Sequence, residues 1–446
     1  MNLITIFTPT HTYNKEFLHE LATSLQNQTY KRFEWLILLN GKCFTEKKRF
    51  ELLKTDFPEL DIRVELENDR SIWNNIGALK ARCCELALGT IYFELDHDDY
   101  LDPSALQLTA DAFDVEDVMF AYSNTVEFFY PRPTEGPISN TYSEVYGWKS
   151  NLLPNGYTEM VAFKPTAHSI RRIEWAPNHL RAFRATAYHH IGGYDKTKAL
   201  GDDHDIICRF YLEYGEGGFY HIDAPLYYYR VYANNTCNGG NRNKEVQDMV
   251  AQNYVSFAEK MYMRWASDEK LDCLDLGGRF NCPEGYKSVD LLDADIICNL
   301  EKPWTNIADD SVGVLRAYHV LEHLRDSFKV GSNGELELVR NGIIHFFNEA
   351  FRVLAPGGFL LIEVPAISGT GAVSDPTHVR FFNTRSFEYF YNNYLAKFIR
   401  PDYTGSFQCS RINEYTWTGT QVSLISCHLI ALKGWYNANW CGERLM

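Results

Sequence analysis

The sequence predicts an α/β protein with two doubly wound domains, and three observations support this fold class. Short apolar runs of strand type alternate with segments of helical periodicity, which is typical of a parallel sheet flanked by helices. A polar stretch rich in Asn and Gly, residues 236–243, interrupts this alternation, which starts again near residue 271. The length of 446 residues also exceeds that of one ordinary domain. We therefore expect domains over residues 1–235 and 268–446, joined by a helical linker over residues 236–267.

The first half contains six apolar runs that we expect to be strands. They are Leu3–Phe7, Phe33–Leu39, Ile62–Leu66, Tyr92–Leu95, Met119–Ser123 and Leu226–Tyr232. Apolar spacing predicts helices around residues 17–25 and over Leu52–Phe57, Ile72–Leu88 and Ile206–Tyr214. Residues 131–160 contain Pro, Ser and Gly, and we expect them to loop over the crevice at the end of the sheet.

Three carboxylates crowd into the four residues Asp96–Asp99, directly after the fourth predicted strand. Like charges at such short spacing repel, and a divalent cation would offset that cost. Mg²⁺ and Mn²⁺ prefer a few carboxylates together with phosphate oxygens. The cluster therefore predicts a metal–diphosphate site with Asp98 and Asp96 as the first candidates for ligands. The alternative is a solvated acidic turn.

Other polar residues also follow predicted strands of the first half. Thr8, Pro9 and Thr10 follow the first strand, and Asn40 follows the second. Since the carboxyl ends of parallel strands share one edge of the sheet, we expect these residues to meet the acidic cluster in one crevice. A second acidic group, Asp202 to Asp205, begins a predicted helix, where the helix dipole alone would also favour it.

Composition excludes several classes of protein. A formal net charge of −15 argues against non-specific binding to nucleic acid or to an anionic membrane. The 11 cysteines are scattered without a C-x-x-C pair, a usage typical of a reducing compartment. The N-terminus has no signal-peptide pattern, and no apolar stretch is long enough to span a membrane. We expect a cytoplasmic protein, and the sequence does not indicate its oligomeric state.

The first half resembles a family 2 glycosyltransferase of GT-A fold. The matching pieces include Thr8 to Thr10, the run from Gly77 to Gly89, the cluster Asp96–Asp99, and the segment from His179 to Tyr194; the others are Ser24 to Thr29, Glu34-Trp35, the 202–205 cluster and Leu226 to Arg230. Two departures are Asn40-Gly41 in place of an acidic base-reading turn, and Tyr232 in place of a metal-reaching His.

That resemblance implies an inverting, metal-dependent transfer from a nucleotide-diphospho-sugar, with roles for particular residues. Thr8, Pro9, Thr10, Asn40 and Asp96 would bind the donor, and Arg82 or Lys80 would contact its phosphates. Asp98 and Asp96 would hold Mg²⁺ or Mn²⁺. Asp203 would be the catalytic base, with Asp202 in reserve. The acceptor would be a glycan or a lipid-linked saccharide, with Trp175, His179 and Arg184 shaping its pocket.

In the second half, expected strands are Leu271–Leu276, Ser288–Asp290, Val312–Tyr318, Phe359–Pro365 and two runs near 408–417 and 422–432. Helices are expected over Glu245–Trp265 and roughly 337–354. The apolar run of the first of these strands ends in Gly277 and Gly278, and the second strand ends in a carboxylate, Asp290. Glycines let backbone approach a cofactor closely, and an acidic strand tip accepts the two hydroxyls of a ribose.

This half resembles class I S-adenosylmethionine-dependent methyltransferases. The pieces that match are Leu274 to Gly278, Asp290, His319 to Leu324, Arg352 to Gly358 and Asp375 to Phe381. The resemblance implies that Asp275, Gly277, Gly278 and Asp290 bind S-adenosylmethionine, with His319 or His378 as the catalytic base. The glycine loop departs from G-x-G-x-G, and the 14 residues between Asp275 and Asp290 are too few for a full first helix.

The two resemblances together predict a bifunctional enzyme of polysaccharide biosynthesis. It would transfer a sugar to a glycan acceptor and O-methylate that glycan with S-adenosylmethionine. One alternative is a glycosyltransferase whose second domain is an inactive scaffold or a binding module. Another is glycosylation of modified DNA bases, against which the net charge of −15 argues.

Overall fold

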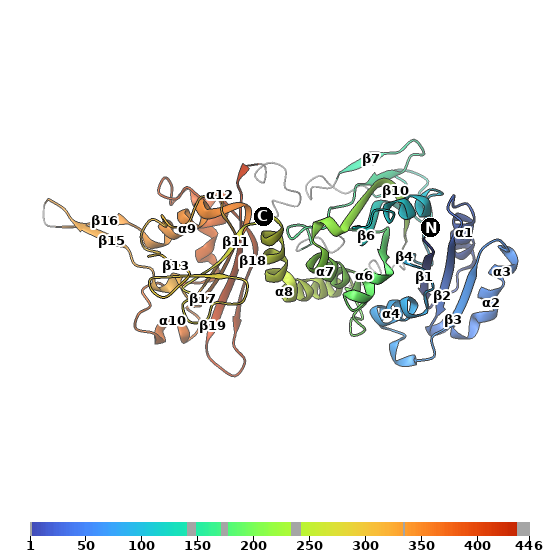
Figure 1. The fold of residues 1–446 in the computed structure, drawn as a ribbon, viewed down its shortest axis with the longest axis horizontal. Coiled ribbons are helices and arrows are strands. Elements are labelled where there is room, and N and C mark those ends of the chain that lie inside the picture. Colours follow the sequence, from blue (N-terminus) through green and yellow to red (C-terminus); the bar gives the residue numbers. More distant parts are fainter. Residues whose placement is uncertain (1, 141–148, 171–176, 233–241, 333–334, 435–446) are drawn as a thin grey trace. The chain divides into compact units, whose positions relative to one another are not determined.

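The computed structural model describes residues 2–140, 149–170, 177–232, 242–332 and 335–434. These residues form two compact units, which divide inside helix α8 (Arg242–Asp268). Unit 1 ends at Met261, and unit 2 begins at Tyr262 (Figure 1). Residues 233–241, which include the start of the expected linker over residues 236–267, lie outside the described ranges, as does part of the predicted covering loop, residues 141–148.

Unit 1 begins with three alternating strands and helices and continues with a series of shorter elements. In chain order they are β1 (Ile4–Thr10), α1 (Lys15–Gln26), β2 (Phe33–Leu39), η1 (Gly41–Glu46), α2 (Lys47–Glu51), α3 (Leu53–Asp56), β3 (Ile62–Leu66), η2 (Arg70–Ile72), α4 (Ile76–Leu86), β4 (Ile91–Glu94), β5 (Tyr100–Leu101), α5 (Ala105–Ala112), β6 (Phe120–Phe129), β7 (Ser150–Leu152), β8 (Thr158–Met160), β9 (Arg181–Arg184), α6 (Ala185–His190), α7 (Asp202–Tyr214), η4 (Glu216–Gly218) and β10 (Phe219–Val231).

The main path of the unit 1 sheet has the order β3-β2-β1-β4-β9-β6-β10-β5, with β7 and β8 attached to β6. Strands β3, β2, β1 and β4 are parallel. The strand order reverses between β1 and β4, which is where α/β sheets bind ligands, at the carboxyl ends of the strands. The candidate functional residues of unit 1 cluster at this edge.

Burial explains why the central strands are mostly apolar. All seven residues of β2 are buried, because helices cover both faces of the sheet. One face packs against Leu18, Leu21 and Leu25 of α1 and Leu106 of α5. On another part of the sheet, aromatic rings of β4, β6 and β9 contact rings of α6 and α7; they include Tyr92, Phe120, Phe183, Tyr188 and Phe210.

Unit 2 is a second α/β layer structure with one separate hairpin. Its elements after α8 are β11 (Asp272–Leu276), β12 (Lys287–Asp290), β13 (Ile296–Ile297), β14 (Val312–Tyr318), η5 (Leu321–His323), β15 (Ser327–Val330), β16 (Leu336–Arg340), α9 (Gly342–Val353), β17 (Leu354–Pro365), α10 (Gly371–Ser374), η6 (Thr384–Phe387), α11 (Glu388–Tyr391), α12 (Asn393–Ala396), β18 (Phe407–Thr416) and β19 (Ser423–Ala431).

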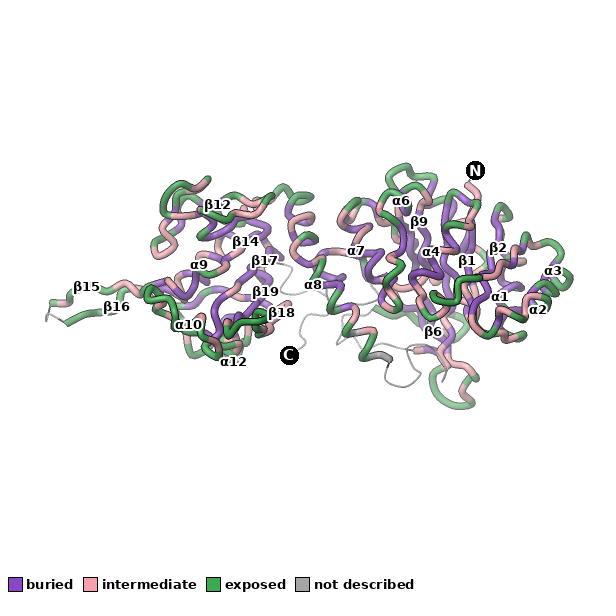
Figure 2. Tube along the Cα trace, turned by 90° about the horizontal axis from the view of Figure 1, so that it is seen from below, coloured by how far each residue is buried: buried purple, intermediate pink, exposed green. Residues whose placement is uncertain are grey.

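The seven-stranded sheet of unit 2 has the order β13-β12-β11-β14-β17-β19-β18. The first five strands in this order are parallel, and β19 lies antiparallel between β17 and β18. The order reverses between β11 and β14, so unit 2 has a switch point of its own. Figure 2 shows buried sheet strands and an exposed β15–β16 hairpin. None of the helices in the described ranges is long and apolar enough to cross a membrane.

The structure corrects two predictions about the first sheet. This sheet is parallel only as far as β4, since β9 runs antiparallel to both of its neighbours, β4 and β6. An antiparallel neighbour needs no crossover helix, so the alternating pattern did not indicate it. The region expected to loop over the crevice contains β7 and β8.

Two helices also begin later than predicted, and each begins at an asparagine cap. The helix expected from Ile72 starts at Ile76, where the Asn75 side chain accepts a hydrogen bond from the Ala78 N–H. The helix expected from residue 337 starts at Gly342, after Asn341 accepts from two backbone N–H groups, and β16 precedes it. A side-chain oxygen at this position satisfies otherwise unpaired donors of the first turn.

The packing of β19 leads to a prediction about pH and stability. His428 is buried on β19, and burial followed by the nearby Arg411 lowers its pKa to about 3. The unfolded chain takes up this proton near pH 6.5, whereas the folded chain stays neutral. The folded state should therefore lose about 2 kcal/mol of stability between pH 7 and pH 5 through this residue. Unfolding at the two pH values should show this loss in the wild type and its absence in His428→Gln.

A matched control is His190→Gln, because the His190 side chain is 61% exposed. This variant should keep the pH dependence of the wild type. An unchanged pH dependence in His428→Gln would contradict the assignment.

Candidate functional site

The acidic cluster lies at the carboxyl end of β4, and its third carboxylate is structural. Asp99 is 1% exposed and accepts hydrogen bonds from the Tyr227 hydroxyl at 2.8 Å and the Arg230 N–H at 2.7 Å. Desolvation, followed by the charges of Asp98 and Asp96, raises the pKa of Asp99 well above its usual value. Asp99 therefore joins the turn after β4 to strand β10 and is not a candidate metal ligand.

Asp96 and Asp98 are the carboxylates that fit a cation. The Asp98 side chain is 13% exposed and accepts from the Tyr232 hydroxyl at 2.9 Å. The Asp96 carboxylate is 44% exposed and lies 3.9 Å from Nε2 of His179. Desolvation and the neighbouring Asp98 raise the pKa of Asp96, which is the effect that a divalent cation would reverse. Carboxylates two positions apart are hard oxygen donors of the kind that Mg²⁺ and Mn²⁺ prefer, and the Tyr232 hydroxyl supports one of them as a hydrogen-bond donor.

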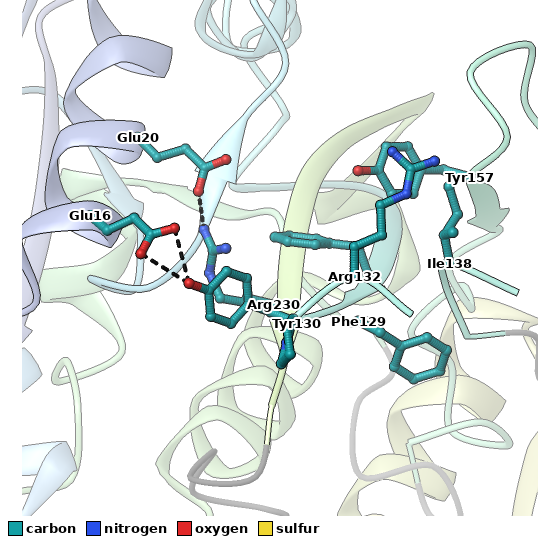
Figure 3. A pocket seen from close by; sticks show the side chains of 10 residues that line it. Glu16, Glu20, Phe129, Tyr130, Arg132, Ile138, Tyr157 and Arg230 are labelled. Atoms are coloured by element: carbon teal, nitrogen blue, oxygen red, sulfur yellow. Dashed lines mark hydrogen bonds and ion pairs between the residues drawn. The ribbon is translucent and has the colours of Figure 1, made fainter. Parts of the chain in front are cut away.

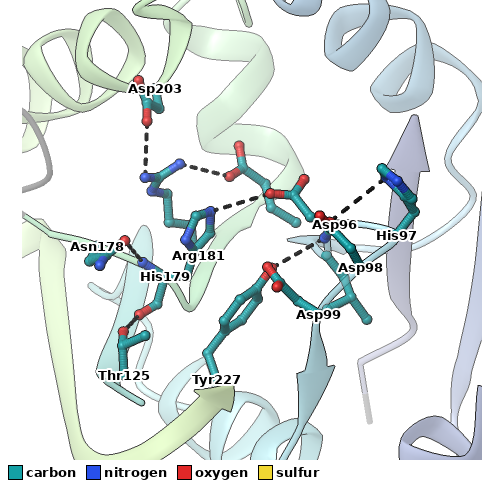
Figure 4. Close-up of polar contacts among 12 residues, drawn as sticks. Asp96, His97, Asp98, Asp99, Thr125, Asn178, His179, Arg181, Asp203 and Tyr227 are labelled. Carbon is teal, nitrogen blue, oxygen red and sulfur yellow. Dashed lines mark hydrogen bonds and ion pairs between the residues drawn. The ribbon is translucent and has the colours of Figure 1, made fainter. Parts of the chain in front are cut away.

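Two buried cations balance the remaining acidic groups of this edge. Lys80 of α4 lies 2.9 Å from Asp202 and 3.4 Å from Glu94. Arg181 of β9, whose side chain is 3% exposed, lies 3.1 Å from Glu94 and 3.0 Å from Asp203. Figure 4 shows Arg181 between Asp203 and the end of β4. The two cations thus tie three elements, α4, β9 and α7, to the last residue of β4.

The pKa values of the two carboxylates that begin α7 are shifted in opposite directions. Desolvation alone would raise the pKa of Asp203, but Arg181, Lys80 and the His204 N–H lower it to about 2. Burial raises the pKa of Asp202 in spite of its contact with Lys80. The N-cap of α7 is Gly201, so helix capping does not explain Asp203. Asp203 is 31% exposed and Asp202 is 6% exposed, and Asp203 is therefore the one that a substrate can reach.

Helix α8 supports the start of α7 within unit 1. Asn253 is buried, donates to the Gly201 carbonyl at 2.9 Å and accepts from the Lys198 ammonium at 2.6 Å. A Cβ at Gly201 would lie 3.4 Å from Cβ of Met249. The segment before Asp202 and Asp203 is therefore packed against a helix that continues unit 1 beyond residue 235.

Thr8, Pro9 and Thr10 are the last residues of β1, which is longer than predicted, and Asn40 follows β2 at the same edge. Their side chains mostly form hydrogen bonds within the protein. The Thr8 hydroxyl donates to the Leu95 carbonyl at 2.8 Å and accepts from the Trp35 indole at 3.0 Å. The Asn40 amide donates to the Thr10 carbonyl at 3.0 Å, the Thr10 hydroxyl donates to the Thr12 carbonyl at 2.9 Å, and Pro9 is half-buried. These contacts fix the backbone of the edge.

Of the remaining predicted residues of unit 1, Arg82 and Arg184 make their contacts away from the acidic cluster, and His179 lies beside it. The Arg82 side chain is 43% exposed and pairs with Glu67 and Glu85. Arg184 donates to backbone carbonyls between Phe113 and Val118, so its role is structural. His179 does lie at the site and stacks on Tyr227 with ring centroids 4.6 Å apart. Trp175 lies outside the described residues.

A cavity of about 380 Å³ lies beside this edge. Its walls carry rings and charges: Glu16 and Glu20 of α1, Phe128 and Phe129 of β6, Tyr130, Arg132, Tyr157 and Arg230 (Figure 3). Glu16 accepts from the Tyr130 hydroxyl at 2.9 Å, and Arg230 pairs with Glu20. Arg230 also donates to the Asp98 carbonyl at 2.7 Å, so one side chain joins the cavity to the acidic cluster.

Arg181 and Glu94 were not among the residues singled out from the sequence. The signal for Glu94 was a charged residue inside a predicted strand, whereas Arg181 lay in a strand that was not predicted. Such a charge is rare unless it is paired. Only the structure identifies the partners, because Glu94 and Arg181 are 87 positions apart.

In unit 2 the residues after β11 form a tight turn. Gly277 has φ of +75°, and a Cβ there would lie 2.9 Å from the Val320 side chain. A Cβ at Gly278 would lie 2.4 Å from the Asp275 carboxylate. Asp275 is 2% exposed and pairs with Arg316 at 2.7 Å, so its contribution is to hold the turn. Asp290 ends β12 next to this turn, and its carboxylate accepts from the Leu291 N–H at 2.6 Å.

The two predicted histidine bases of unit 2 lie near this edge. His319 follows β14 with φ of +56°, a conformation that costs a non-glycine residue about 1 kcal/mol. The carboxylates of Glu322 and Glu363, 3.3 and 3.5 Å away, raise its pKa to about 9. His319 is therefore largely protonated at neutral pH and is not suited to act as a base there. Nδ1 of His378 donates to the Ala372 carbonyl at 2.9 Å, which leaves Nε2 free of that bond.

Comparisons with known proteins give weak similarities. No model of a known protein family matches the chain. It is 24% identical over 230 residues to the uncharacterized protein y4gI of Sinorhizobium fredii, which covers 51% of this chain and 22% of that protein. The chain thus spans about a fifth of the length of this relative. It is 22% identical over 256 residues to an uncharacterized glycosyltransferase of Haemophilus influenzae, covering 56% of this chain and 73% of that protein.

Among solved structures, the chain is similar to residues 1–349 of TarS from S. aureus in complex with UDP-GlcNAc. The TM-score is 0.41 with 14% identity, over 59% of this chain and 70% of that one. The complex of the same TarS region with UDP gives a TM-score of 0.40. A TM-score below 0.5 does not establish a shared fold.

The ion pairs of α4 predict the effect of removing one cation. Lys80→Met should destabilise unit 1 by about 3–5 kcal/mol, because it leaves the buried carboxylates Asp202 and Glu94 without this partner. Lys196→Met is the matched control, and it should cost less than about 1 kcal/mol because its ion pair with Glu85 is exposed on both sides. Denaturant unfolding measures both. Equal effects of the two substitutions would contradict the buried network.

Proposed function

We propose that unit 1 transfers a sugar from a nucleotide-diphospho-sugar to a hydroxyl group of a glycan or a lipid-linked saccharide. The observation that carries this proposal is the meeting of Asp96 and Asp98 with Arg181 and Asp203 at the switch point of the sheet. The name of the H. influenzae relative, a glycosyltransferase, agrees with it. The overall acidity of the chain favours a saccharide acceptor over DNA.

On the donor side, Asp98 and Asp96 would hold Mg²⁺ or Mn²⁺. When bound, such an ion supplies Lewis-acid stabilisation of the charge on the leaving diphosphate. Tyr232 supports Asp98 through its hydroxyl, and Asp99 fixes the turn that carries both ligands. The backbone around Thr8 to Thr10 and Asn40 would position the nucleotide.

On the acceptor side, Asp203 would take the proton of the attacking hydroxyl. A base with a pKa of about 2 is ionised at neutral pH but weak. We infer that the proton leaves late, after the new oxygen–carbon bond has begun to form and has made the hydroxyl acidic. Attack from the face opposite the leaving diphosphate would invert the sugar carbon. The cavity lined by Tyr130, Tyr157 and Arg132 would receive the acceptor, since aromatic rings stack on sugar faces and charged groups bind hydroxyls.

We propose that unit 2 binds S-adenosylmethionine and O-methylates the glycan. The supporting observation is a glycine turn, Gly277 and Gly278, at the switch point between β11 and β14, with Asp290 at the end of the adjacent strand. Asp290 would accept the ribose hydroxyls, and the glycine backbone would contact the amino-acid part of the cofactor. The protonated state of His319 is the observation that favours the alternative, an inactive scaffold.

Sugar transfer should depend on two carboxylates with different roles. A screen of nucleotide-sugar donors would identify the donor. Asp98→Asn and Asp203→Asn should then each lower turnover by at least about 100-fold, because one loses the ion and the other the base. Asp203→Asn should still bind a nucleoside diphosphate with Mg²⁺, whereas Asp98→Asn should bind it weakly.

The control for this pair is Asp111→Asn, an exposed residue on α5 that should leave turnover unchanged. Wild-type turnover in Asp203→Asn would disprove the role of the base. Thermal unfolding of each variant separates loss of activity from loss of fold.

Cofactor binding separates an active unit 2 from a scaffold. Calorimetry of the full chain with S-adenosylmethionine should show one site, and Asp290→Asn should weaken it by about tenfold or more through the loss of charge-assisted hydrogen bonds. Asp309→Asn, 72% exposed, is the control. Absence of binding to the wild type would favour the scaffold.

A further inference from the structure

Three side chains of unit 2 that the proposed reactions leave without a role meet after strand β14. Glu322 and His323 belong to η5, and His378 comes from the segment after α10. Each offers one ligand atom, and these three atoms lie within 4.8 Å of one another. The two segments are held together, because the Val379 and Arg380 N–H groups donate to the Glu322 carbonyl at 2.8 and 3.1 Å.

Both histidines have one ring nitrogen engaged as a hydrogen-bond donor. Nδ1 of His378 donates to the Ala372 carbonyl at 2.9 Å. The Thr377 hydroxyl donates to Asp375 at 2.6 Å, so it can only accept from Nδ1 of His323, 3.1 Å away. Each Nε2 then carries a lone pair. Metal-binding histidines are oriented in this way, by a carbonyl or a carboxylate that fixes the tautomer.

Glu322 supplies an independent indication of a missing partner. It is 1% exposed, and within the described part of the chain neither carboxylate oxygen has a hydrogen-bond partner. The His319 imidazole, which Glu322 shares with Glu363, lies 3.3 Å from one Glu322 oxygen without the geometry of a hydrogen bond and 3.5 Å from Glu363. His319 therefore balances the charge of Glu322 only in part, and a buried carboxylate that accepts no hydrogen bond remains costly.

We propose that Glu322, His323 and His378 bind a divalent transition metal, with Zn²⁺ as the best fit. Two imidazole nitrogens and one carboxylate are a ligand set that Zn²⁺ takes in proteins, and it leaves a fourth position open for water or a hydroxyl group. Imidazole ligands also select transition metals over Mg²⁺. His378 is then a ligand and not a base. This site is separate from Asp96 and Asp98, and it stands or falls independently of either transfer reaction.

The test uses the full chain, stripped of metal by a chelator and then titrated with Zn²⁺ in excess Mg²⁺. The Mg²⁺ occupies the oxygen-ligand site of unit 1 without competing for imidazole. Calorimetry should show one Zn²⁺ per chain. Co²⁺ in place of Zn²⁺ should give the visible absorption of a tetrahedral site with nitrogen ligands.

Variants assign the ligands. His323→Ala, His378→Ala and Glu322→Gln should each abolish the Co²⁺ spectrum and weaken Zn²⁺ binding by at least about 100-fold. Thr377→Val removes only the support of His323 and should weaken it by about 10–100-fold. His345→Ala, a histidine of α9 outside the cluster, should bind as the wild type does.

Two results would overturn the proposal. One is the absence of stoichiometric Zn²⁺ binding to the wild type, and the other is wild-type affinity in His378→Ala. Circular dichroism checks the fold of every variant. If Glu322→Gln fails to fold, Thr377→Val and His378→Ala still decide the outcome.

Discussion

Charge balance around Glu94 is the constraint on which unit 1 depends. Glu94 is the last residue of β4 and is buried where the strand order reverses, next to the acidic pair of α7 and just before the cluster Asp96–Asp99. Two buried cations, Lys80 and Arg181, make this density of negative charge tolerable. Because each cation contacts two carboxylates from different elements, the same ion pairs that neutralise the edge also set the distance between α4, β9 and α7. The geometry of the site and the stability of unit 1 therefore depend on the same ion pairs.

The two units solve the problem of a polar strand edge differently. Unit 1 places ionised groups there and pairs them, and it uses Thr8 and Asn40 to satisfy the backbone of the edge. Unit 2 has glycines at its switch point. Its nearby carboxylates have other positions, because Asp275 pairs with Arg316 and Glu322 lies in the turn after β14. The first arrangement leaves Asp96 and Asp98 available for a cation, and the second lets a ligand come close to the backbone.

Much of the fold followed from local pattern. The bounds of β2 and β3 agree with the predicted runs, because β2 is a mostly apolar run that stops at Asn40-Gly41 and β3 alternates apolar with charged residues. Strand β9 was missed because its four residues, Arg181–Arg184, carry a charge at each end, and its burial depends on an ion pair with a distant strand. The late starts of α4 and α9 depend on the conformations of Asn75 and Asn341, which apolar periodicity does not report. The candidate sites show the same limit, because Asp99 became a structural anchor and Asp275 an ion-pair partner only through contacts with distant arginines.

Helix α8 extends the smallest part of the chain that contains unit 1 intact. Asn253 of this helix forms hydrogen bonds with Gly201 and Lys198 in the loop that leads into α7. The support for Asp203 therefore comes from beyond residue 235, where the recognisable sequence motifs end. A division of the chain at residue 235 would remove the hydrogen bonds of Asn253 to this loop. A fragment that contains the whole of unit 1 must therefore include the first part of α8, and the same helix continues into the fold of unit 2.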